Sequence, residues 1–362
     1  MHSSASQVST QRRGGLITVT SSGGAAGAAV AWRTRGALFV TAIVKGTFSL
    51  MPDAVMVPLA PEPVASDEQD DGSGMGLYSA SELAPYLRYA DVELTGHAHP
   101  LPGAKQVEAR LEVIRDGKLL LHKGVSLPVP EASGATPSVR VVGMAPLSRS
   151  WPVRRRLLGA LDPRALQGPI LHIPDGFDWS YFQAAPPDQR LRALRGDEWI
   201  AFTGMHPPRG WFRTRLPRVE AAAKVFGQWA GPPRSVRLYA DTLHIDVDRQ
   251  ICTVLWRGWF PVAEERHLAA LHVAVGLTPR GQAMRPRTDG LPAAPPFRAT
   301  GPEAFAKTLL ADGATAGAEL PAQASSVAGP RDPGLPQTVL LRLPTEPPRA
   351  CSKTVNMVER HR

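Results

Sequence analysis

Two histidines and two carboxylates stand at alternate positions in the stretch from Asp91 to His99. If this stretch is one extended strand, then Asp91, Glu93, His97 and His99 project from a single face, because side chains of a strand alternate between its faces. Imidazole nitrogens and carboxylate oxygens are zinc ligands, so a metal site is compatible with this spacing. Histidines two residues apart on a half-exposed strand are more often ordinary surface residues, and no HExxH helix accompanies them. We therefore predict no bound metal, and a metal-dependent enzyme is the least favoured of three hypotheses.

A second group of acidic residues lies in residues 171–208, the segment with the densest mixture of aromatic, proline and glycine residues. The spacing of these acids differs from the alternating oxygen ligands of an EF-hand loop. Pro174-Asp175-Gly176 and Arg195-Gly196-Asp197 instead have the composition of tight turns. We expect these carboxylates to shape turns or to contact a partner. The acids are Asp175, Asp178, Asp188, Asp197 and Glu198.

Signatures of a catalytic nucleophile or of a phosphate-binding loop are absent from the sequence. There is no GxSxG motif, and Lys45-Gly46-Thr47 inverts the order of residues in a P-loop. Cys252 lies in the apolar run ICTVLW, where a thiol acts as a small hydrophobic group, and Cys351 is far away in a proline-rich stretch. Two separated cysteines exclude a disulfide framework and a four-thiolate zinc site. We predict neither an enzymatic activity nor a cofactor.

The charge of the chain is basic and unevenly distributed. The formal net charge is +9; residues 1–100 carry 6 basic and 9 acidic side chains, and the remainder carries 35 and 23, so the two parts have charges of −3 and +12. A positive field favours association with nucleic acid, acidic proteins or anionic membranes. The basic run 209–218 contains Trp211 and Phe212, which could stack on bases. Its alternation is equally typical of a half-buried strand, so nucleic acid is the less favoured partner and a nucleic-acid-binding module is the alternative hypothesis.

The elements that position these residues are predicted to be mostly strands. The 36 prolines and 33 glycines disfavour long helices. The β-branched and aromatic residues of 38–50 predict a strand, and Asp116-Gly117 predicts a tight hairpin turn. We expect a mainly β fold of antiparallel sheets, sandwich-like or barrel-like, with a few short helices. Further strands are predicted at 91–99, 106–115, 118–127, 139–144, 235–239, 242–247, 251–260 and 267–277, and short helices at 79–87, 151–161 and 302–311.

The polar N-terminus and the proline-rich C-terminus frame the predicted fold. We expect a disordered arm at 1–15, a β-rich domain at 16–300 with possible halves at 16–148 and 170–280, and at 301–362 a short helix followed by a largely disordered Pro/Ala-rich tail. The first residues lack the apolar region of a secretory signal, and no run is long enough to span a bilayer. These features predict a cytoplasmic protein with no membrane partner.

Several short motifs, in their order along the chain, resemble those of the domain of unknown function family 2169 from Gram-negative bacteria. The resemblance covers roughly residues 20–280. Members of that family look like cytoplasmic adaptors or chaperones that load a type VI secretion effector onto its cognate spike protein, so the resemblance implies protein binding without catalysis. The motifs are VKGTF at 44–48, the strand 91–99, PDGFDWSYFQAAPPDQR at 174–190, LRGDEWI at 194–200, HPP at 206–208, ADTLHIDVD at 240–248 and VLWRG at 254–258.

The resemblance implies that residues 174–208 take part in partner binding. Aromatic side chains would be the anchors of such an interface, and the polar residues around them would form its rim. At least two of the five aromatic residues are also expected to be buried. The expected contact residues are the aromatic Phe177, Trp179, Tyr181, Phe182 and Trp199, and the polar Asp175, Asp178, Asp188, Gln189, Arg190, Arg195, Asp197 and Glu198.

Overall fold

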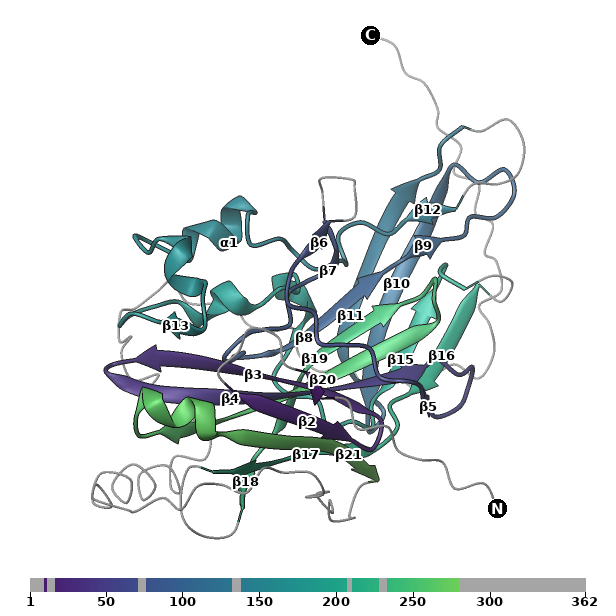
Figure 1. Ribbon diagram of the computed structural model, residues 1–362. Coiled ribbons are helices and arrows are strands. Elements are labelled where there is room, and N and C mark those ends of the chain that lie inside the picture. Colours follow the sequence, from purple (N-terminus) through teal and green to yellow (C-terminus); the bar gives the residue numbers. More distant parts are fainter. Residues whose placement is uncertain are drawn as a thin grey trace, which may run out of the picture.

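A computed structural model of the chain describes residues 10–11, 17–70, 76–131, 138–206, 210–227 and 233–279 (Figure 1). The predicted tail 301–362 with its helix, and most of the predicted arm 1–15, lie outside these ranges. Within that arm, β1 (Thr10–Gln11) pairs with β2 (Thr18–Ser22), so this part of the arm is ordered as a strand. In the ranges given above, no helix is long and apolar enough to cross a membrane.

An eight-stranded sheet forms the centre of the molecule (Figure 1). Its order is β13-β3-β4-β20-β19-β8-β14, with β5 paired to β4. Strands from 16–148 and from 170–280 are therefore interleaved in one sheet. The two ranges that the sequence suggested as possible halves therefore share this sheet. Its strands are β3 (Ala25–Thr34), β4 (Ala37–Ser49), β5 (Val57–Pro58), β8 (Ala90–Thr95), β13 (Ile170–His172), β14 (Arg190–Leu191), β19 (Tyr239–Asp246) and β20 (Ile251–Val262).

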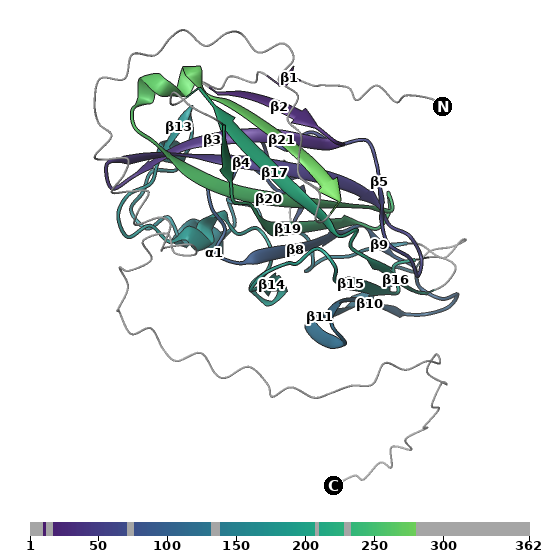
Figure 2. The ribbon, with the colours of Figure 1, turned by 90° about the horizontal axis from the view of Figure 1, so that it is seen from below.

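A five-stranded sheet and a four-stranded sheet accompany the central sheet (Figure 2). The first has the order β1-β2-β21-β17-β18 and packs through β2 and β21 on β3; the second has the order β11-β10-β15-β16. Their further strands are β10 (Gln106–Arg115), β11 (Lys118–Pro128), β15 (Trp199–Thr203), β16 (Trp211–Arg215), β17 (Val219–Phe226), β18 (Arg234–Val236) and β21 (His272–Pro279). Two small ribbons pair β9 (His97–Ala98) with β12 (Val139–Arg140) and β6 (Gln69–Asp70) with β7 (Leu77–Ser79).

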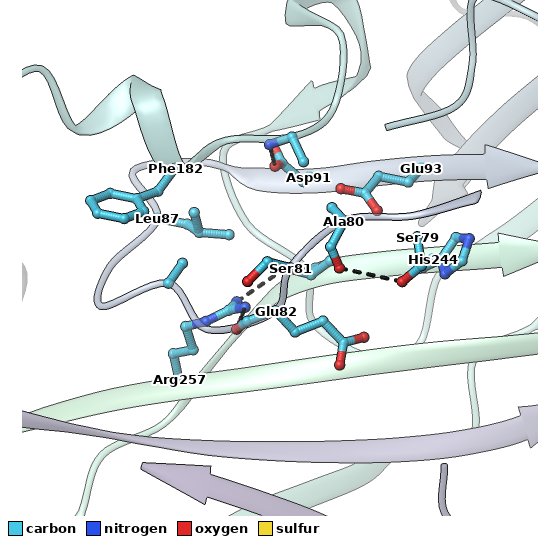
Figure 3. A pocket seen from close by; sticks show the side chains of 13 residues that line it. Ser79, Ala80, Ser81, Glu82, Leu87, Asp91, Glu93, Phe182, His244 and Arg257 are labelled. Atoms are coloured by element: carbon cyan, nitrogen blue, oxygen red, sulfur yellow. Dashed lines mark hydrogen bonds between the residues drawn. The ribbon is translucent and has the colours of Figure 1, made fainter. Parts of the chain in front are cut away.

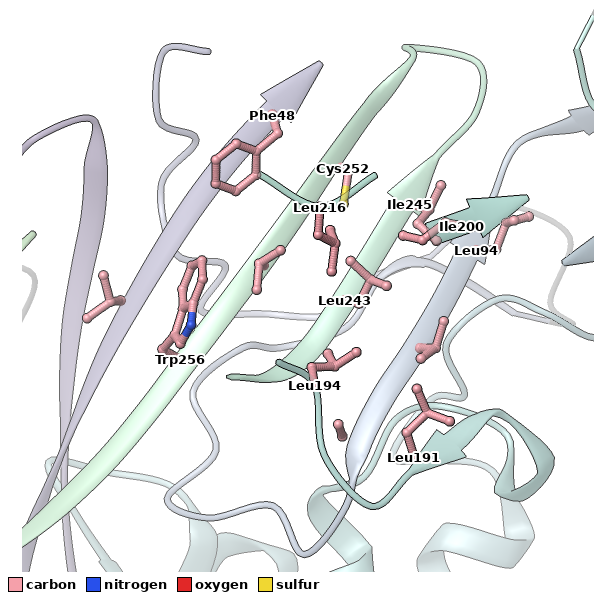
Figure 4. Packing of buried hydrophobic residues seen from close by; sticks show 14 of the residues in the cluster. Phe48, Leu94, Leu191, Leu194, Ile200, Leu216, Leu243, Ile245, Cys252 and Trp256 are labelled. Carbon is pink, nitrogen blue, oxygen red and sulfur yellow. The ribbon is translucent and has the colours of Figure 1, made fainter. Parts of the chain in front are cut away.

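One hydrophobic cluster joins these three sheets. Figure 4 shows the part of it between the central sheet and the four-stranded sheet. Leu94 on β8 and Ile245 on β19 are fully buried and belong to the same cluster as Ile200 of the four-stranded sheet. The five-stranded sheet approaches closely at Gly27, where an added Cβ would lie 2.4 Å from the side chain of Val275. Burial of this much apolar surface is the main stabilising contribution to the fold.

Local strand predictions are largely confirmed. The strand predicted at 38–50 is β4, and those at 106–115 and 118–127 are β10 and β11. Asp116 and Gly117 both have positive φ, 51° and 74°, as the predicted hairpin turn requires. Cys252 is buried and has no disulfide partner among the described residues, and burial raises the pKa of its thiol, as expected for a small hydrophobic group.

The predicted helix at 79–87 is wrong. These residues run extended over the central sheet, where the Glu82 carboxylate accepts hydrogen bonds from Lys45 Nζ and from the backbone N–H of Ala65, both at 2.7 Å. Pro85 also disfavours helical geometry in the residue before it. The buried ion pair and the proline therefore override the local preference that predicted a helix at 79–87.

Three pairs of strands differ from the antiparallel pattern that short connections predict. β13 with β3, β19 with β8, and β2 with β21 are parallel, and each pair joins segments far apart in the sequence. The strand predicted at 139–144 is reduced to β12, and the one predicted at 267–277 begins with a 3₁₀ helix (Glu265–Ala270) before β21. In the described ranges the sheets are mostly antiparallel and none closes into a barrel.

In the part of the chain that the structure describes, helices are few and short. α1 (Pro152–Arg156) lies within the predicted helix 151–161 and starts with a proline, which suits the first helical position. Three more 3₁₀ helices are Pro163–Leu166, Trp179–Phe182 and Pro187–Gln189. The last two belong to the segment expected to bind partners.

Candidate functional site

The first part of the 174–208 segment covers the outer face of the central sheet with aromatic side chains. Asp178 begins the 3₁₀ helix Trp179–Phe182, and its carboxylate accepts a hydrogen bond from the Ser180 backbone N–H at 2.9 Å. The Trp179 ring packs edge-on against Trp32, with ring centres 5.5 Å apart. Of the five expected anchors, Tyr181 and Phe182 are buried, and Phe177, Trp179 and Trp199 are half-buried. The expectation that at least two are buried is confirmed.

Asp91 of β8 holds the middle of this segment. Its carboxylate accepts hydrogen bonds from Gln183 Nε2 at 2.7 Å and from the backbone N–H groups of Ala184 and Ala185 at 2.7 and 3.1 Å. The Arg190 guanidinium lies 3.8 Å away. Burial raises the pKa of Asp91, and these hydrogen bonds and Arg190 oppose that increase. Asp91 therefore anchors the chain path of the segment.

Two expected contact residues have structural roles inside the protein. Gln189 Nε2 donates to the carbonyl oxygens of Val92 and Met144 at 2.8 and 2.9 Å. Glu198 accepts three hydrogen bonds, at 2.7, 2.8 and 3.1 Å, from the successive backbone N–H groups of residues 195–197. Both side chains are fully buried, so they shape the segment and do not reach its surface.

The remaining polar members of the segment are exposed or half-buried, and most have partners within the chain. Asp175 lies 3.5 Å from Arg35, Arg195 lies 3.4 Å from Asp116, and Asp188 pairs with Lys123. Isolated surface ion pairs of this kind contribute about 0–1 kcal/mol each. The exposed residues are Asp175, Asp178, Asp188 and Arg195, and the half-buried ones are Arg190 and Asp197.

A layer of buried charged side chains occupies the next part of the same sheet face, below a covering segment, residues 62–89, of which 71–75 are not described. Lys45 and Glu82 form an ion pair at 2.7 Å, and both are almost fully buried. Arg257 pairs with Asp241 and donates to the Glu82 carbonyl oxygen at 2.7 Å. Burial raises the pKa of Asp241 to about 6. Sequence reasoning missed this layer, although VKGTF and VLWRG contain Lys45 and Arg257.

A cavity of about 20 Å³ lies within this layer, enough space for about one water molecule (Figure 3). Glu93 and His244, neighbours on the parallel strands β8 and β19, both line it. Burial and, to a smaller extent, the charges of Asp91 and Glu82 raise the pKa of Glu93 to about 8. Burial, together with the charge of Lys45, lowers the pKa of His244 to about 4. Near pH 7 both side chains are therefore mostly uncharged, and the cavity is too small for a substrate.

The four residues considered for a metal site do not share a face. Gly96 has a φ of 125° and interrupts the strand between β8 and β9, so the side-chain alternation does not continue from Glu93 to His97. His97 Nδ1 lies 2.7 Å from the Asp248 carboxylate, whereas Asp91 is buried against Gln183. Among the residues that the structure describes, no group of three or more His, Cys, Asp or Glu side chains could hold a metal ion.

A larger cavity of about 290 Å³ opens at the surface next to α1. Leu158, Leu166 and Tyr181 are among its lining residues, together with the arginines Arg149 and Arg155. Tyr181 thus connects the 174–208 segment to this cavity. The sequence predicted a short helix at 151–161, but the position of its arginines relative to Tyr181 depends on the tertiary fold.

The outward face of the four-stranded sheet carries a stack of tryptophan and arginine side chains. The Arg213 guanidinium lies 5.0 Å from the ring centre of Trp199 and 5.8 Å from that of Trp211, and the Arg215 guanidinium lies 5.7 Å from Trp199. Trp211 is 46% exposed, and Val55, exposed to 47%, bridges to Arg215 at the edge. We call Val55, Trp199, Trp211, Arg213 and Arg215 the Trp–Arg face.

The sequence profile of a family described as "Uncharacterized protein conserved in bacteria (DUF2169)" matches residues 35–125 and 121–257. These matches cover more than half of the chain and contain β4, β8, the 174–208 segment and β19. The chain belongs to this family. No curated protein and no solved structure matches it.

Proposed function

We propose that the protein is a cytoplasmic adaptor that binds a type VI secretion effector and promotes its loading onto the cognate spike protein. The proposal starts from the resemblance of the chain's motifs to those of proteins that look like such adaptors, whereas the matched family is itself described only as uncharacterized. The 174–208 segment supports it indirectly, since its buried aromatic residues and hydrogen bonds build a rigid scaffold. Rigid elements lower the entropy cost of presenting a binding surface.

The Trp–Arg face is the observation that carries the proposal. Tryptophan and arginine are the residue types most enriched at the energetic centres of protein interfaces. Trp211 of β16 is exposed, and so is Val55, which forms an isolated bridge to Arg215 of the same strand. The face stands on β15 and β16, whose opposite side is buried in the core by Ile200 and Phe212. An exposed apolar and cationic surface on a rigid sheet suits a protein partner.

Nucleic acid remains the second candidate partner, since the same face combines tryptophan rings with basic side chains. Two contacts favour protein over nucleic acid. Arg213 Nε donates to Asp53 at 3.0 Å, and Arg215 Nε donates to the Asp197 carbonyl oxygen at 3.1 Å, so both guanidinium groups are partly engaged. Both guanidinium groups also lie against the Trp199 ring, so a nucleic-acid base would have to displace them in order to stack on it.

Co-purification tests the proposal. The tagged chain is co-expressed with effector and spike proteins encoded beside its gene, and captured partners are identified by mass spectrometry. We expect the wild-type chain to retain an effector, and Trp211→Ala together with Arg213→Ala to reduce its capture at least tenfold. Leu101→Ala is the control, because Leu101 is 77% exposed and lies outside the Trp–Arg face.

Each result has a distinct meaning. Capture of neither an effector nor a spike protein by the wild-type chain would contradict the adaptor function. Capture that the double variant leaves unchanged would show that another surface binds the effector. Retention of nucleic acid, with an affinity that falls steeply as salt rises, would favour the alternative, since phosphate contacts release counterions.

A further inference from the structure

The cavity next to α1 is a second surface site, separate from the Trp–Arg face. α1 and β16 lie at opposite sides of the molecule in both views (Figures 1 and 2). The cavity lies between α1 and the 3₁₀ helix Pro163–Leu166 and has a volume of about 290 Å³. This is close to the lower limit of about 300 Å³ for small-ligand pockets. A volume of this size accommodates a single large side chain with its backbone, and not a folded element.

The charged side chains around the cavity favour a negatively charged ligand. Two arginines and no acidic residue line it. Arg155 is exposed, and the structure gives it no ion pair within the described part of the chain. Arg149 lies 4.0 Å from the Glu68 carboxylate, a contact too long for a strong hydrogen bond. At least one guanidinium therefore remains available, and arginine binds carboxylates through paired N–H groups.

Tyr181 adds a hydroxyl group without a protein partner. Its side chain is 5% exposed and lines the cavity, and within the described residues its phenolic oxygen makes no hydrogen bond. The phenolic oxygen is not fully enclosed by protein atoms, so the hydroxyl can donate a hydrogen bond to a carboxylate in the cavity. Arg154 fixes the position of Tyr181, because its guanidinium donates to the Tyr181 carbonyl oxygen at 3.1 and 2.7 Å and lies over the Tyr181 ring.

The remaining walls are partly apolar. Leu158, Pro163 and Leu166 line the cavity together with the polar residues Ser150 and Gln167, and Leu158 is buried. The occupant must therefore present a carboxylate and an apolar group within the volume of one residue. A glutamate or aspartate side chain provides the charge without the apolar group. The C-terminal residue of a chain provides both when its side chain is apolar, because the α-carboxylate adjoins the side chain.

We propose that the cavity next to α1 binds the apolar C-terminal residue of a partner protein, with its α-carboxylate at Arg155 and Tyr181 and its side chain against Leu158 and Leu166. This inference concerns a different surface from the Trp–Arg face and holds for any partner with such a C-terminus. Its test requires neither an effector nor a spike protein, so its failure and the failure of the adaptor function are distinguishable.

Peptide binding tests the inference. The probe is the fluorescein-labelled peptide Gly-Ser-Gly-Gly-Leu with a free C-terminus, and its affinity for the full chain is measured by fluorescence anisotropy. We expect C-terminal amidation to weaken binding at least tenfold, because it removes the charge and preserves the shape. An amidated peptide with an internal glutamate, Gly-Ser-Glu-Gly-Gly, is expected to bind no better than the amidated leucine peptide.

Variants locate the binding in the cavity. Arg155→Gln is expected to reduce the affinity for the free-acid peptide about tenfold, and Tyr181→Phe about threefold. Arg156→Gln is the matched control, since Arg156 is exposed on the same helix but does not line the cavity. Thermal unfolding confirms that each variant is folded. Absence of binding by the free-acid peptide, equal binding of its amide, equal losses in Arg155→Gln and Arg156→Gln, or preferred binding of the glutamate peptide would overturn the proposal.

Discussion

Two cavities, each lined by one residue of the 3₁₀ helix Trp179–Phe182, have opposite characters. Phe182 lines the small cavity of about 20 Å³, which is surrounded by charges that are paired with one another or neutralised by shifted pKa values. Tyr181, its neighbour in the sequence, lines the open cavity of about 290 Å³, where Arg155 has no ion partner in the described structure. The side of the helix at Phe182 thus stabilises the fold, and the side at Tyr181 is the one that we propose binds a partner. Substitutions on the two sides should therefore affect different properties.

The largest effect is expected for Lys45→Met. This change leaves the buried Glu82 carboxylate without its ion partner, and breaking a buried pair in this way costs about 3–5 kcal/mol of unfolding free energy. Arg33→Met is the control, because it breaks an exposed pair with Glu265 at 3.3 Å and should cost about 0–1 kcal/mol. Chemical denaturation measures both changes. Similar losses in the two variants would contradict the structural role of the buried layer.

A smaller loss, about 2–3 kcal/mol, is expected for Gln183→Leu. The substitution removes the Nε2 donor to the buried Asp91 carboxylate, and hydrogen bonds to charged groups contribute about 1.5–3 kcal/mol. Gln167→Leu, at the exposed edge of the open cavity, should change the unfolding free energy by less than about 0.5 kcal/mol. Urea denaturation compares the two variants. An equal loss would remove the distinction between the two sides.

The buried layer also predicts a pH dependence of stability. The folded-state pKa of Glu93, about 8, is above its ordinary value of 4.5, so between these values the folded protein binds more protons than the unfolded chain. The free energy of unfolding then falls as pH rises, by at most about 1.4 kcal/mol per pH unit for this group. His244, whose pKa is lowered from 6.5 to about 4, has the opposite effect below pH 6.5.

Glu93→Gln isolates this contribution. Between about pH 6.5 and 8 the variant should lose less stability than the wild type, because glutamine does not ionise. Denaturation curves at both ends of this range measure the difference. Parallel pH profiles for variant and wild type would show that Glu93 titrates as an ordinary carboxyl group.

The smallest effect on stability is expected on the open side. Arg155→Gln should change the unfolding free energy by less than about 0.5 kcal/mol, since the exposed guanidinium makes no ion pair in the described structure. The same variant should lose free-acid peptide binding. Thermal denaturation and anisotropy, performed on one preparation, separate the two properties. A loss above about 1 kcal/mol would give Arg155 a structural role instead.

Local features of the fold were predictable from the sequence. The hairpin at Asp116-Gly117 and the strand β4 follow from turn chemistry and from residue alternation, which act over a few residues. The helix predicted at 79–87 failed because Glu82 pairs with Lys45, which is 37 residues away. Strong long-range contacts override a weak local propensity.

The candidate site was predictable only in part. The sequence marked 174–208 as an unusual segment, and the burial of two of its aromatic residues is confirmed. It did not reveal that Gln189 and Glu198 are internal, because polar residues are buried only where the fold supplies hydrogen-bond partners. It also could not place Tyr181 beside Arg155.

The sequence by itself determined the mainly β character, several strands, a tight turn and the family of this protein, because these depend on residue patterns along the chain. Tertiary structure decided which polar groups meet. Asp91 and Gln183 are 92 residues apart. Lys45 lies on β4, whereas Glu82 lies in the covering segment 62–89. The parallel pairing of β8 with β19 brings Glu93 next to His244. Such contacts arise from the packing of distant elements. The burial that this packing creates shifts the pKa values of the buried groups. The same packing places the residues that line the cavity next to α1.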